Sequence, residues 1–362
     1  MLSIPAVSKA REEGEAMPVD KRKLKGKEPL PLLEVRGVQT YYYTDFGVVK
    51  AVDGVSFSVR RGEKVAIIGE SGAGKSQTGM SILRLIPSPP GRIVGGEIIY
   101  EGVDLLKLPE EEMREYRGVH IGVIFQEAAQ ALNPVYKVGT QIADAYRVHH
   151  DCTKEEAWEK AVEMLRKVQI SNPEQRAQEY PHQFSGGMRQ RAIIALAMVN
   201  SPNLLIADEP TTALDVTTEA KIIKLINDLA VKENKALIFI THDLAVAAGL
   251  CDRFLIMYAG KIVENSSAMQ LFSDPKHPYA QQLLEALIDV SKSEDEIMAI
   301  PGLPPDPYNR PKGCSFHPRC RKVKAICQEV EPEMITIEGD RQVACHYYTD
   351  YQAPKLKVVS SS

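Results

Sequence analysis

Length, composition and charge exclude several classes of protein before any motif is considered. The chain has 362 residues, about twice the length of an ordinary domain, so we expect one large α/β domain with a smaller one appended. Its 44 basic and 48 acidic residues give a net charge of -4, which supplies no overall attraction for nucleic acid. The sequence has neither a long apolar run nor a signal-peptide pattern, so we expect a cytosolic chain.

The N-terminal part of the chain predicts an arm followed by short strands. Residues 1–32 mix charged residues with prolines and show no apolar periodicity, which indicates a flexible arm. Apolar residues recur between 33 and 38, and they alternate with polar ones over 55–59. These patterns predict a small antiparallel layer ahead of the main sheet.

A strand, a glycine-rich loop and a helix come next. Residues 64–68 form a short apolar run that ends at the loop, and residues 76–86 read as a helix that stops before Pro87. The loop therefore joins a buried strand to a helix.

The middle of the chain alternates between helical and strand patterns. Over 128–186 apolar residues recur at helical spacing between charged ones, which predicts a helical insert. The runs 204–207 and 236–240 are apolar throughout, as strands of a covered parallel sheet should be, with a crossover helix at 219–231 between them. Proline and glycine then become frequent, and we expect a separate C-terminal module at 291–362.

The glycine-rich loop, GESGAGKS over residues 69–76, has the pattern of a phosphate-binding loop. Glycines let several backbone N–H groups point at one oxygen cluster, and the following helix N-terminus favours negative charge. Lys75 is expected to reach the β- and γ-phosphates, and Ser76 to ligate Mg²⁺. The nucleotide contacts expected from this segment are Gly69, Ser71, Gly72, Gly74, Lys75, Ser76 and Gln77.

Three polar residues follow the apolar runs. Asp208 comes at the C-terminal edge of the sheet, where ligands of open α/β sheets collect, and is expected to hold Mg²⁺. Glu209 points in a different direction and is expected to be the base that activates water. An acidic pair is often an ordinary strand end, but the upstream loop favours the functional interpretation. His242, after the second run, is expected to contact the γ-phosphate.

The segment FSGGMRQR, residues 184–191, resembles the signature motif of ABC-transporter ATPases. Ser185 is a natural N-cap, and Gly186 and Gly187 open the backbone at a helix N-terminus, which makes a second anion site. The resemblance implies that each ATP is bound between two subunits, with the signature covering the partner's nucleotide. Phenylalanine and Met188 stand where leucine and glutamine are commoner, but the serine and glycines are kept.

The family's remaining motifs appear in the same order. The resemblance makes Gln126 the Q-loop glutamine, with a role in catalysis and at Mg²⁺, Asp215 the aspartate of the D-loop, and His242 the switch histidine. It also places Tyr42 against adenine, with the tyrosines on either side as alternatives. The family's fold is a P-loop ABC cassette with a mainly parallel core sheet, and the nucleotide-binding domain is expected at 33–290.

The C-terminal part of the chain resembles one group within this family. Met188 in the signature is familiar in ATPases of the oligopeptide and dipeptide import group. The segments HPY at 277–279, LL at 283–284 and GCSFHPRC at 313–320 resemble that group's C-terminal region.

This resemblance implies an ATP-hydrolysing subunit of a peptide importer, at the cytoplasmic face of the cell membrane. The implied partners are a second, related ATPase, two permease subunits and an extracellular substrate-binding protein, with no nucleic acid. Nickel and oligosaccharide importers have similar ATPases and remain alternatives. A soluble cassette protein acting on nucleic acid or ribosomes is less favoured, because neither a tandem cassette nor a coiled-coil insert is present. A monomeric P-loop kinase would have no use for the signature.

Four of the six cysteines lie in the C-terminal module. They are Cys314, Cys320, Cys327 and Cys345. Structural zinc usually has ligands in closely spaced pairs, which are absent here, whereas four thiolates also suit an iron-sulfur cluster. The resemblance favours a structural [4Fe-4S] cluster, with zinc and free thiols as the alternatives.

Overall fold

The structure is a computed structural model that describes most of the chain. The described residues are 30–126, 131–212, 214–288 and 300–349. From Pro31 onward they belong to one unit. Residues 1–29 of the arm predicted at 1–32 lie outside the described residues, so the arm stays a prediction. Among the described helices, none has the length and apolar character needed to cross a membrane.

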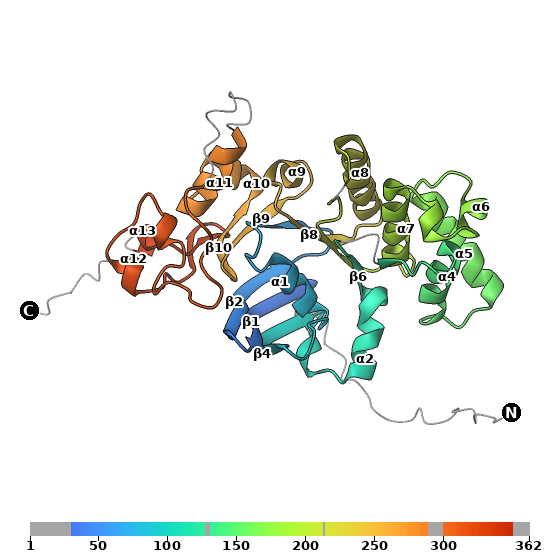
Figure 1. Ribbon diagram of the computed structural model, residues 1–362, viewed down its shortest axis with the longest axis horizontal. Coiled ribbons are helices and arrows are strands. Elements are labelled where there is room, and N and C mark those ends of the chain that lie inside the picture. The colour runs from blue at the N-terminus through green and yellow to red at the C-terminus, as the bar shows by residue number, and fades with distance from the viewer. Residues whose placement is uncertain (1–29, 127–130, 213, 289–299, 350–362) are drawn as a thin grey trace, which may run out of the picture. The chain divides into compact units, whose positions relative to one another are not determined.

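An antiparallel sheet forms the N-terminal layer, as the alternating sequence predicted. In the order β2-β1-β4-β5, its strands are β1 (Leu33–Thr44), β2 (Gly47–Val59), β4 (Gly91–Tyr100) and β5 (Val103–Asp104). Buried side chains of this layer share one apolar core with strands of the main sheet. The layer, blue to cyan in Figure 1, is therefore fixed against the sheet that carries the phosphate loop.

Within the described residues, the main sheet has eight strands in the order β11-β12-β10-β9-β3-β8-β7-β6. The strands are β3 (Lys64–Ile68), β6 (Ile121–Ile124), β7 (Leu204–Asp208), β8 (Ala236–Thr241), β9 (Arg253–Tyr258), β10 (Lys261–Ser267), β11 (Ile335–Glu338) and β12 (Arg341–Val343). The neighbours from β9 to β6 pair in parallel. Every residue of β7 and β8 is buried, which explains why both strands are apolar along almost their whole length.

The C-terminal segment extends this sheet. β12 pairs with β10 in antiparallel register, with Glu264 opposite Val343 and Asn265 opposite Gln342, and β11 pairs with β12. The sequence predicted a separate module here, but its strands are hydrogen-bonded to the cassette. Its short helices are α12 (Ile326–Glu329) and α13 (His346–Thr349), drawn in red in Figure 1.

Helices connect the strands and form the insert. They are α1 (Lys75–Ile82), α2 (Glu110–Glu115), α4 (Val138–Arg147), α5 (Lys154–Lys167), α6 (Pro173–Ala177), α7 (Gly186–Met198), α8 (Val216–Lys232), α9 (Leu244–Ala248), α10 (Ala268–Ser273) and α11 (Pro278–Ile288). The predicted insert contains α4, α5 and α6, drawn in green in Figure 1. α5 begins with a capping box in which Thr153 and Glu156 satisfy each other's backbone N–H groups.

The predicted end of the first helix is wrong. We expected a helix to residue 86, but α1 ends at Ile82. Arg84 has φ 53, in the left-handed region, and a helix cannot continue through that conformation. The side chain of Arg84 donates to the carbonyls of Leu105 and Leu108, so tertiary contacts hold the turn.

Candidate nucleotide-binding site

The phosphate loop lies between β3 and α1, and packing requires glycine at two of its positions. A Cβ at Gly69 would lie 2.2 Å from the carbonyl oxygen of Met257, and one at Gly74 would lie 2.2 Å from that of Ala51. Gly74 also has φ 100, and Gly72 has φ 78, a region that favours glycine. The sequence correctly indicated that glycines allow this loop, although at Gly69 the reason is close packing.

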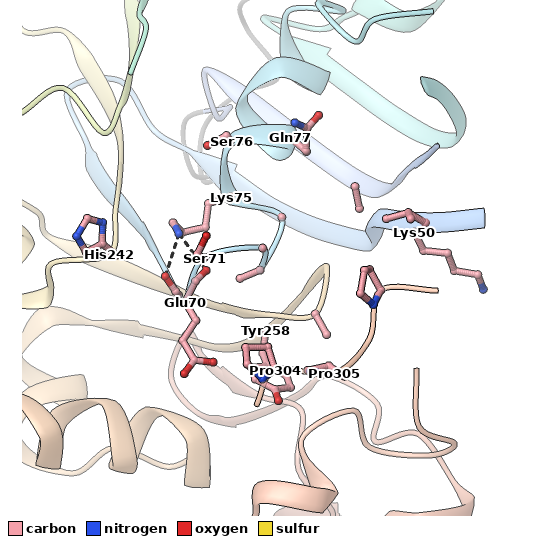
Figure 2. Close-up of a pocket in the computed structure, with 18 of the residues that line it drawn as sticks. Lys50, Glu70, Ser71, Lys75, Ser76, Gln77, His242, Tyr258, Pro304 and Pro305 are labelled. Carbon is pink, nitrogen blue, oxygen red and sulfur yellow. Dashed lines mark hydrogen bonds between the residues drawn. The ribbon is translucent and has the colours of Figure 1, made fainter. Parts of the chain in front are cut away.

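Lys75 is the buried cation of the loop, and its side chain is 5% exposed. Its ammonium donates to the carbonyls of Gly69 and Glu70 at 2.9 and 3.1 Å, drawn as dashed lines in Figure 2. Burial lowers the pKa of Lys75, while the nearby carboxylates of Glu209 and Asp208 oppose that shift. The positive charge is therefore held above the loop, where a phosphate would meet it.

Ser76 and Asp208 form a pair of oxygen donors beside the loop. The hydroxyl of Ser76 donates to Asp208 Oδ1 at 2.9 Å. Burial raises the pKa of Asp208 to about 6, and the bond from Ser76 acts in the opposite direction. A hydroxyl and a buried carboxylate side by side are the donors that Mg²⁺ prefers, so these residues fit the predicted metal.

Glu209 turns away from Asp208, as the sequence predicted. Its backbone has φ 42, and its N–H bonds the carbonyl of Ile240 at 2.9 Å, which turns the chain at the end of β7. Its carboxylate accepts from Gln126 Nε2 at 2.9 Å and lies 3.4 Å from His242 Nδ1. Three residues from separate segments, each predicted to be catalytic, are thus brought together.

A cavity of about 1250 Å³ extends from these residues over the phosphate loop. Tyr42 lines it, and its hydroxyl bonds the side chain of Gln77. Tyr41 instead donates to Asp53 at 2.7 Å. The predicted residues on the cavity wall are Tyr42, Gly69, Ser71, Gly72, Gly74, Lys75, Ser76, Gln77, Gln126, Glu209 and His242. The cavity is large enough for a nucleotide.

The opposite wall comes from residues that the sequence did not indicate. Pro304, Pro305, Asp306, Pro307 and Arg310 of the C-terminal segment line the same cavity. Tyr258 lines the cavity together with the first two prolines, and all three are labelled in Figure 2. Arg310 pairs with Asp53 at 3.1 Å and so attaches the segment to β2. The sequence predicted only a separate, proline- and glycine-rich module here, because nothing in it indicates which surface it contacts.

The signature residues lie away from this cavity. Ser185 caps α7 by accepting from the N–H of Met188 at 3.3 Å, as predicted, and Asp215 caps α8. A Cβ at Gly187 would lie 2.8 Å from the Thr218 side chain, so glycine allows the two helices to approach. Among the described residues on the cavity wall, none belongs to the signature segment or is Asp215. The separation agrees with two phosphate-binding elements that serve different nucleotides.

The four C-terminal cysteines line one small cavity of about 20 Å³. Burial raises the pKa of Cys314 to about 11 and also raises the pKa values of Cys320 and Cys345. The backbone N–H of Cys314 bonds the carbonyl of Cys327 at 2.8 Å. Within the described residues no group of three or more His, Cys, Asp or Glu side chains has the arrangement of a metal site. The four thiols surround one cavity, but no three of them are placed as ligands of a single metal ion.

The fold and the cavity define a nucleotide-hydrolysing P-loop cassette. The ABC transporter family matches residues 52–212, and the oligopeptide/dipeptide transporter C-terminal region matches residues 263–327. A dimeric, post-hydrolysis structure of the ATP-binding cassette MJ0796, bound to ADP and Pi, superposes with a TM-score of 0.59 and 27% identity. The superposition covers 65% of this chain and 98% of that chain.

Relatives match over most of their length. The probable peptide ABC transporter ATP-binding protein y4tR of Sinorhizobium fredii is 48% identical, covering 87% of this chain and 94% of its own. OppD of Bacillus subtilis, an oligopeptide transport ATP-binding protein, is 47% identical, with coverage of 90% and 91%. DppD of Escherichia coli, a dipeptide transport ATP-binding protein, is 42% identical, with coverage of 89% and 98%. The chain belongs to the ABC transporter ATPases, in the group that carries the oligopeptide/dipeptide transporter C-terminal region.

Proposed function

We propose that this chain is the ATP-hydrolysing subunit of a peptide importer and works at the cytoplasmic face of the membrane. The observation that carries the ATP-hydrolysing role is the convergence of Glu209, Gln126 and His242 at the phosphate loop, and the match of residues 263–327 to the oligopeptide/dipeptide transporter C-terminal region supports the importer role. The names of the relatives, which refer to peptide, oligopeptide and dipeptide transport, support the cargo. Nickel and oligosaccharides remain the alternative cargoes.

In the proposed reaction the residues around the loop divide the chemistry. Glu209 takes the proton of the water that attacks the γ-phosphorus, and the bond to the β-phosphate oxygen breaks to give ADP and phosphate. Gln126 orients that water, and His242 contacts the γ-phosphate. Lys75 stabilises negative charge that spreads over the phosphate oxygens. Ser76 and Asp208 would hold Mg²⁺, which would neutralise negative charge on the phosphate oxygens. Tyr42 stacks on the base.

The signature supplies the dependence on a second subunit. Ser185, Gly186, Gly187 and Asp215 lie away from this chain's own cavity, so we infer that they complete the site of a partner ATPase. A nucleotide can favour the closed pair only by binding it more tightly than the open one. Contacts from the partner's signature provide that difference, and closure is passed to the permeases. Met188 in the signature favours a related sister chain as the partner.

The substitution Glu209→Gln tests the catalytic assignment. It keeps the size of the side chain but removes the base, so steady-state ATP hydrolysis by the assembled transporter should fall about 100-fold or more. Binding of Mg-ATP should persist. Turnover within about twofold of wild type would refute the assignment.

Two further variants separate binding from closure. Lys75→Ala should weaken nucleotide binding itself, because it removes the cation that faces the phosphates. Ser185→Arg should leave binding to the isolated chain intact and block pairing with the partner. Equal effects of both variants on binding and on pairing would contradict this division of roles.

Membrane partners can be tested by coexpressing this chain with the genes that neighbour its own. We expect the chain to be recovered with permeases, and with a sister ATPase, after the membranes are solubilised. Uptake of labelled dipeptides and longer peptides into vesicles, compared with nickel and an oligosaccharide, then identifies the cargo. Recovery of the chain alone would contradict the transporter assignment.

We also propose that the four cysteines hold a structural [4Fe-4S] cluster. The proposal is supported by four thiols on one cavity and by the preference of such clusters for four cysteine thiolates. Anaerobically purified protein should contain iron and acid-labile sulfide that Cys320→Ser removes. Cys152→Ser is the control, because Cys152 does not line that cavity. Finding no iron in the anaerobically purified protein would refute the cluster.

A further inference from the structure

The phosphate loop is joined to the C-terminal segment by an ion pair. The guanidinium of Arg319 donates to both carboxylate oxygens of Glu70, at 2.6 and 2.9 Å. Glu70 is the second residue of the loop, and Arg319 follows it by 249 positions in the chain. Two parallel bonds between a guanidinium and a carboxylate fix both distance and orientation.

Arg319 is held in place by other contacts besides Glu70. Its side chain is only 5% exposed. Its Nε donates to the carbonyl of Pro301 at 2.9 Å, its Nη2 donates to that of Ile300 at 3.3 Å, and its guanidinium lies 6.0 Å from the ring centre of Tyr258. The hydrogen bonds with Glu70 are the main cause that raises the pKa of Arg319. The loop is therefore tied to a charged group that cannot move freely.

The backbone of Glu70 passes this constraint to the phosphate-binding lysine. The carbonyl of Glu70 accepts from the ammonium of Lys75 at 3.1 Å. Its N–H donates to the hydroxyl of Tyr279 at 2.9 Å. Tyr279 belongs to a cluster of rings with Tyr258 and Phe316, whose centres lie 4.7 to 5.3 Å apart. The carboxylate, the N–H and the carbonyl of this one loop residue are each held by a different segment.

We propose that Arg319 is a positioning residue for nucleotide binding. By holding Glu70, it keeps the phosphate loop and the Lys75 ammonium in the geometry that receives the phosphates. The proposal rests on the proposed function only in taking ATP as the ligand of the loop. If the pair served the C-terminal segment alone, breaking it would destabilise that segment and leave the affinity for ATP unchanged.

If the negative charge of Glu70 acted directly on the nucleotide, Glu70→Gln would change the affinity for ATP in the opposite direction. Glu70 lines the nucleotide cavity, so simple electrostatics predicts that removing its negative charge tightens the binding of a polyphosphate. Positioning predicts weaker binding, because Glu70→Gln loses the charge-assisted bonds to Arg319. The direction of the change in Kd therefore distinguishes the two explanations.

The test measures Mg-ATP binding to the purified full chain by equilibrium dialysis, in a Glu209→Gln background that blocks hydrolysis. We expect Arg319→Met and Glu70→Gln each to raise Kd about tenfold, which corresponds to about 1.4 kcal/mol. The double variant should also be about tenfold weaker, and not hundredfold, since both changes break one contact. Arg319→Lys should recover part of the loss because it keeps the charge.

Arg321→Met is the matched control. Arg321 lies two positions further along, and its guanidinium pairs with Glu285 at 2.7 Å, away from the loop. This variant should leave Kd unchanged. The proposal would be overturned if both single variants changed Kd by less than twofold, or if Glu70→Gln bound ATP more tightly. It would also be overturned if the losses in the double variant were additive. If Arg319→Met fails to fold, Glu70→Gln still decides. Failure of the Glu209→Gln parent to bind ATP would count against the ATP site itself.

Discussion

A buried ion pair between β10 and β12 allows a quantitative prediction about how the C-terminal segment is attached. Arg341 Nη2 lies 2.8 Å from Glu264 Oε1, and the side chains are 2% and 0% exposed. Removing one partner of a buried pair costs about 3–5 kcal/mol, because the other charge is left without compensation. We therefore predict that Arg341→Met lowers the free energy of unfolding.

The surroundings of Glu264 place the loss at the lower end of that range. Its carboxylate also accepts from the backbone N–H of Lys276 at 3.0 Å and of His277 at 2.7 Å, so it stays partly compensated. Arg341 Nε already has no hydrogen-bond partner among the described residues. We expect a loss of about 3 kcal/mol.

Urea unfolding followed by circular dichroism measures this loss, and hydrogen exchange over residues 335–349 locates it. The double variant Arg341→Met with Glu264→Gln should recover at least about 1 kcal/mol, because no charge is then buried alone. A loss below about 1 kcal/mol in the single variant would refute the reasoning. So would a double variant no more stable than the single one.

Three further predictions concern the cavity and the fold. Tyr42→Ala should weaken ATP binding by about 1–3 kcal/mol if the ring stacks on the base, and Tyr42→Phe should not; equal Kd values for both would contradict stacking. Gly74→Ala should abolish nucleotide binding, since its Cβ would lie 2.2 Å from the Ala51 carbonyl; dialysis showing normal affinity would refute this. Burial lowers the pKa of His277 to about 3 from its usual 6.5, so the unfolded chain takes up a proton below pH 6.5 that the folded chain does not. Stability should fall from pH 6.5 towards pH 3 by at most about 1.4 kcal/mol per pH unit. His277→Gln should lose less stability than wild type between pH 7 and 5 in urea titrations, and equal losses would contradict the prediction.

Much of the site could be predicted because each part occupies a short, contiguous segment. The glycines of the loop, the acidic pair after a buried strand and the serine before α7 are recognised by residue type and spacing. The end of α1 could not be predicted in this way. Arg84 adopts a left-handed conformation that arginine rarely takes, and contacts from residues 105 and 108 hold it there.

The sequence by itself determined that this chain carries a phosphate loop and a signature, since both are local patterns with a chemical requirement for each residue. Only the tertiary structure decided how the C-terminal segment completes the site. Residues 304–307 reach the cavity, and Arg319 reaches Glu70 across 249 positions. Such contacts depend on the pairing of β12 with β10 and on packing against Tyr258 and Tyr279. No single segment's periodicity encodes them, because the energy of a distant contact is realised only when both segments are in place.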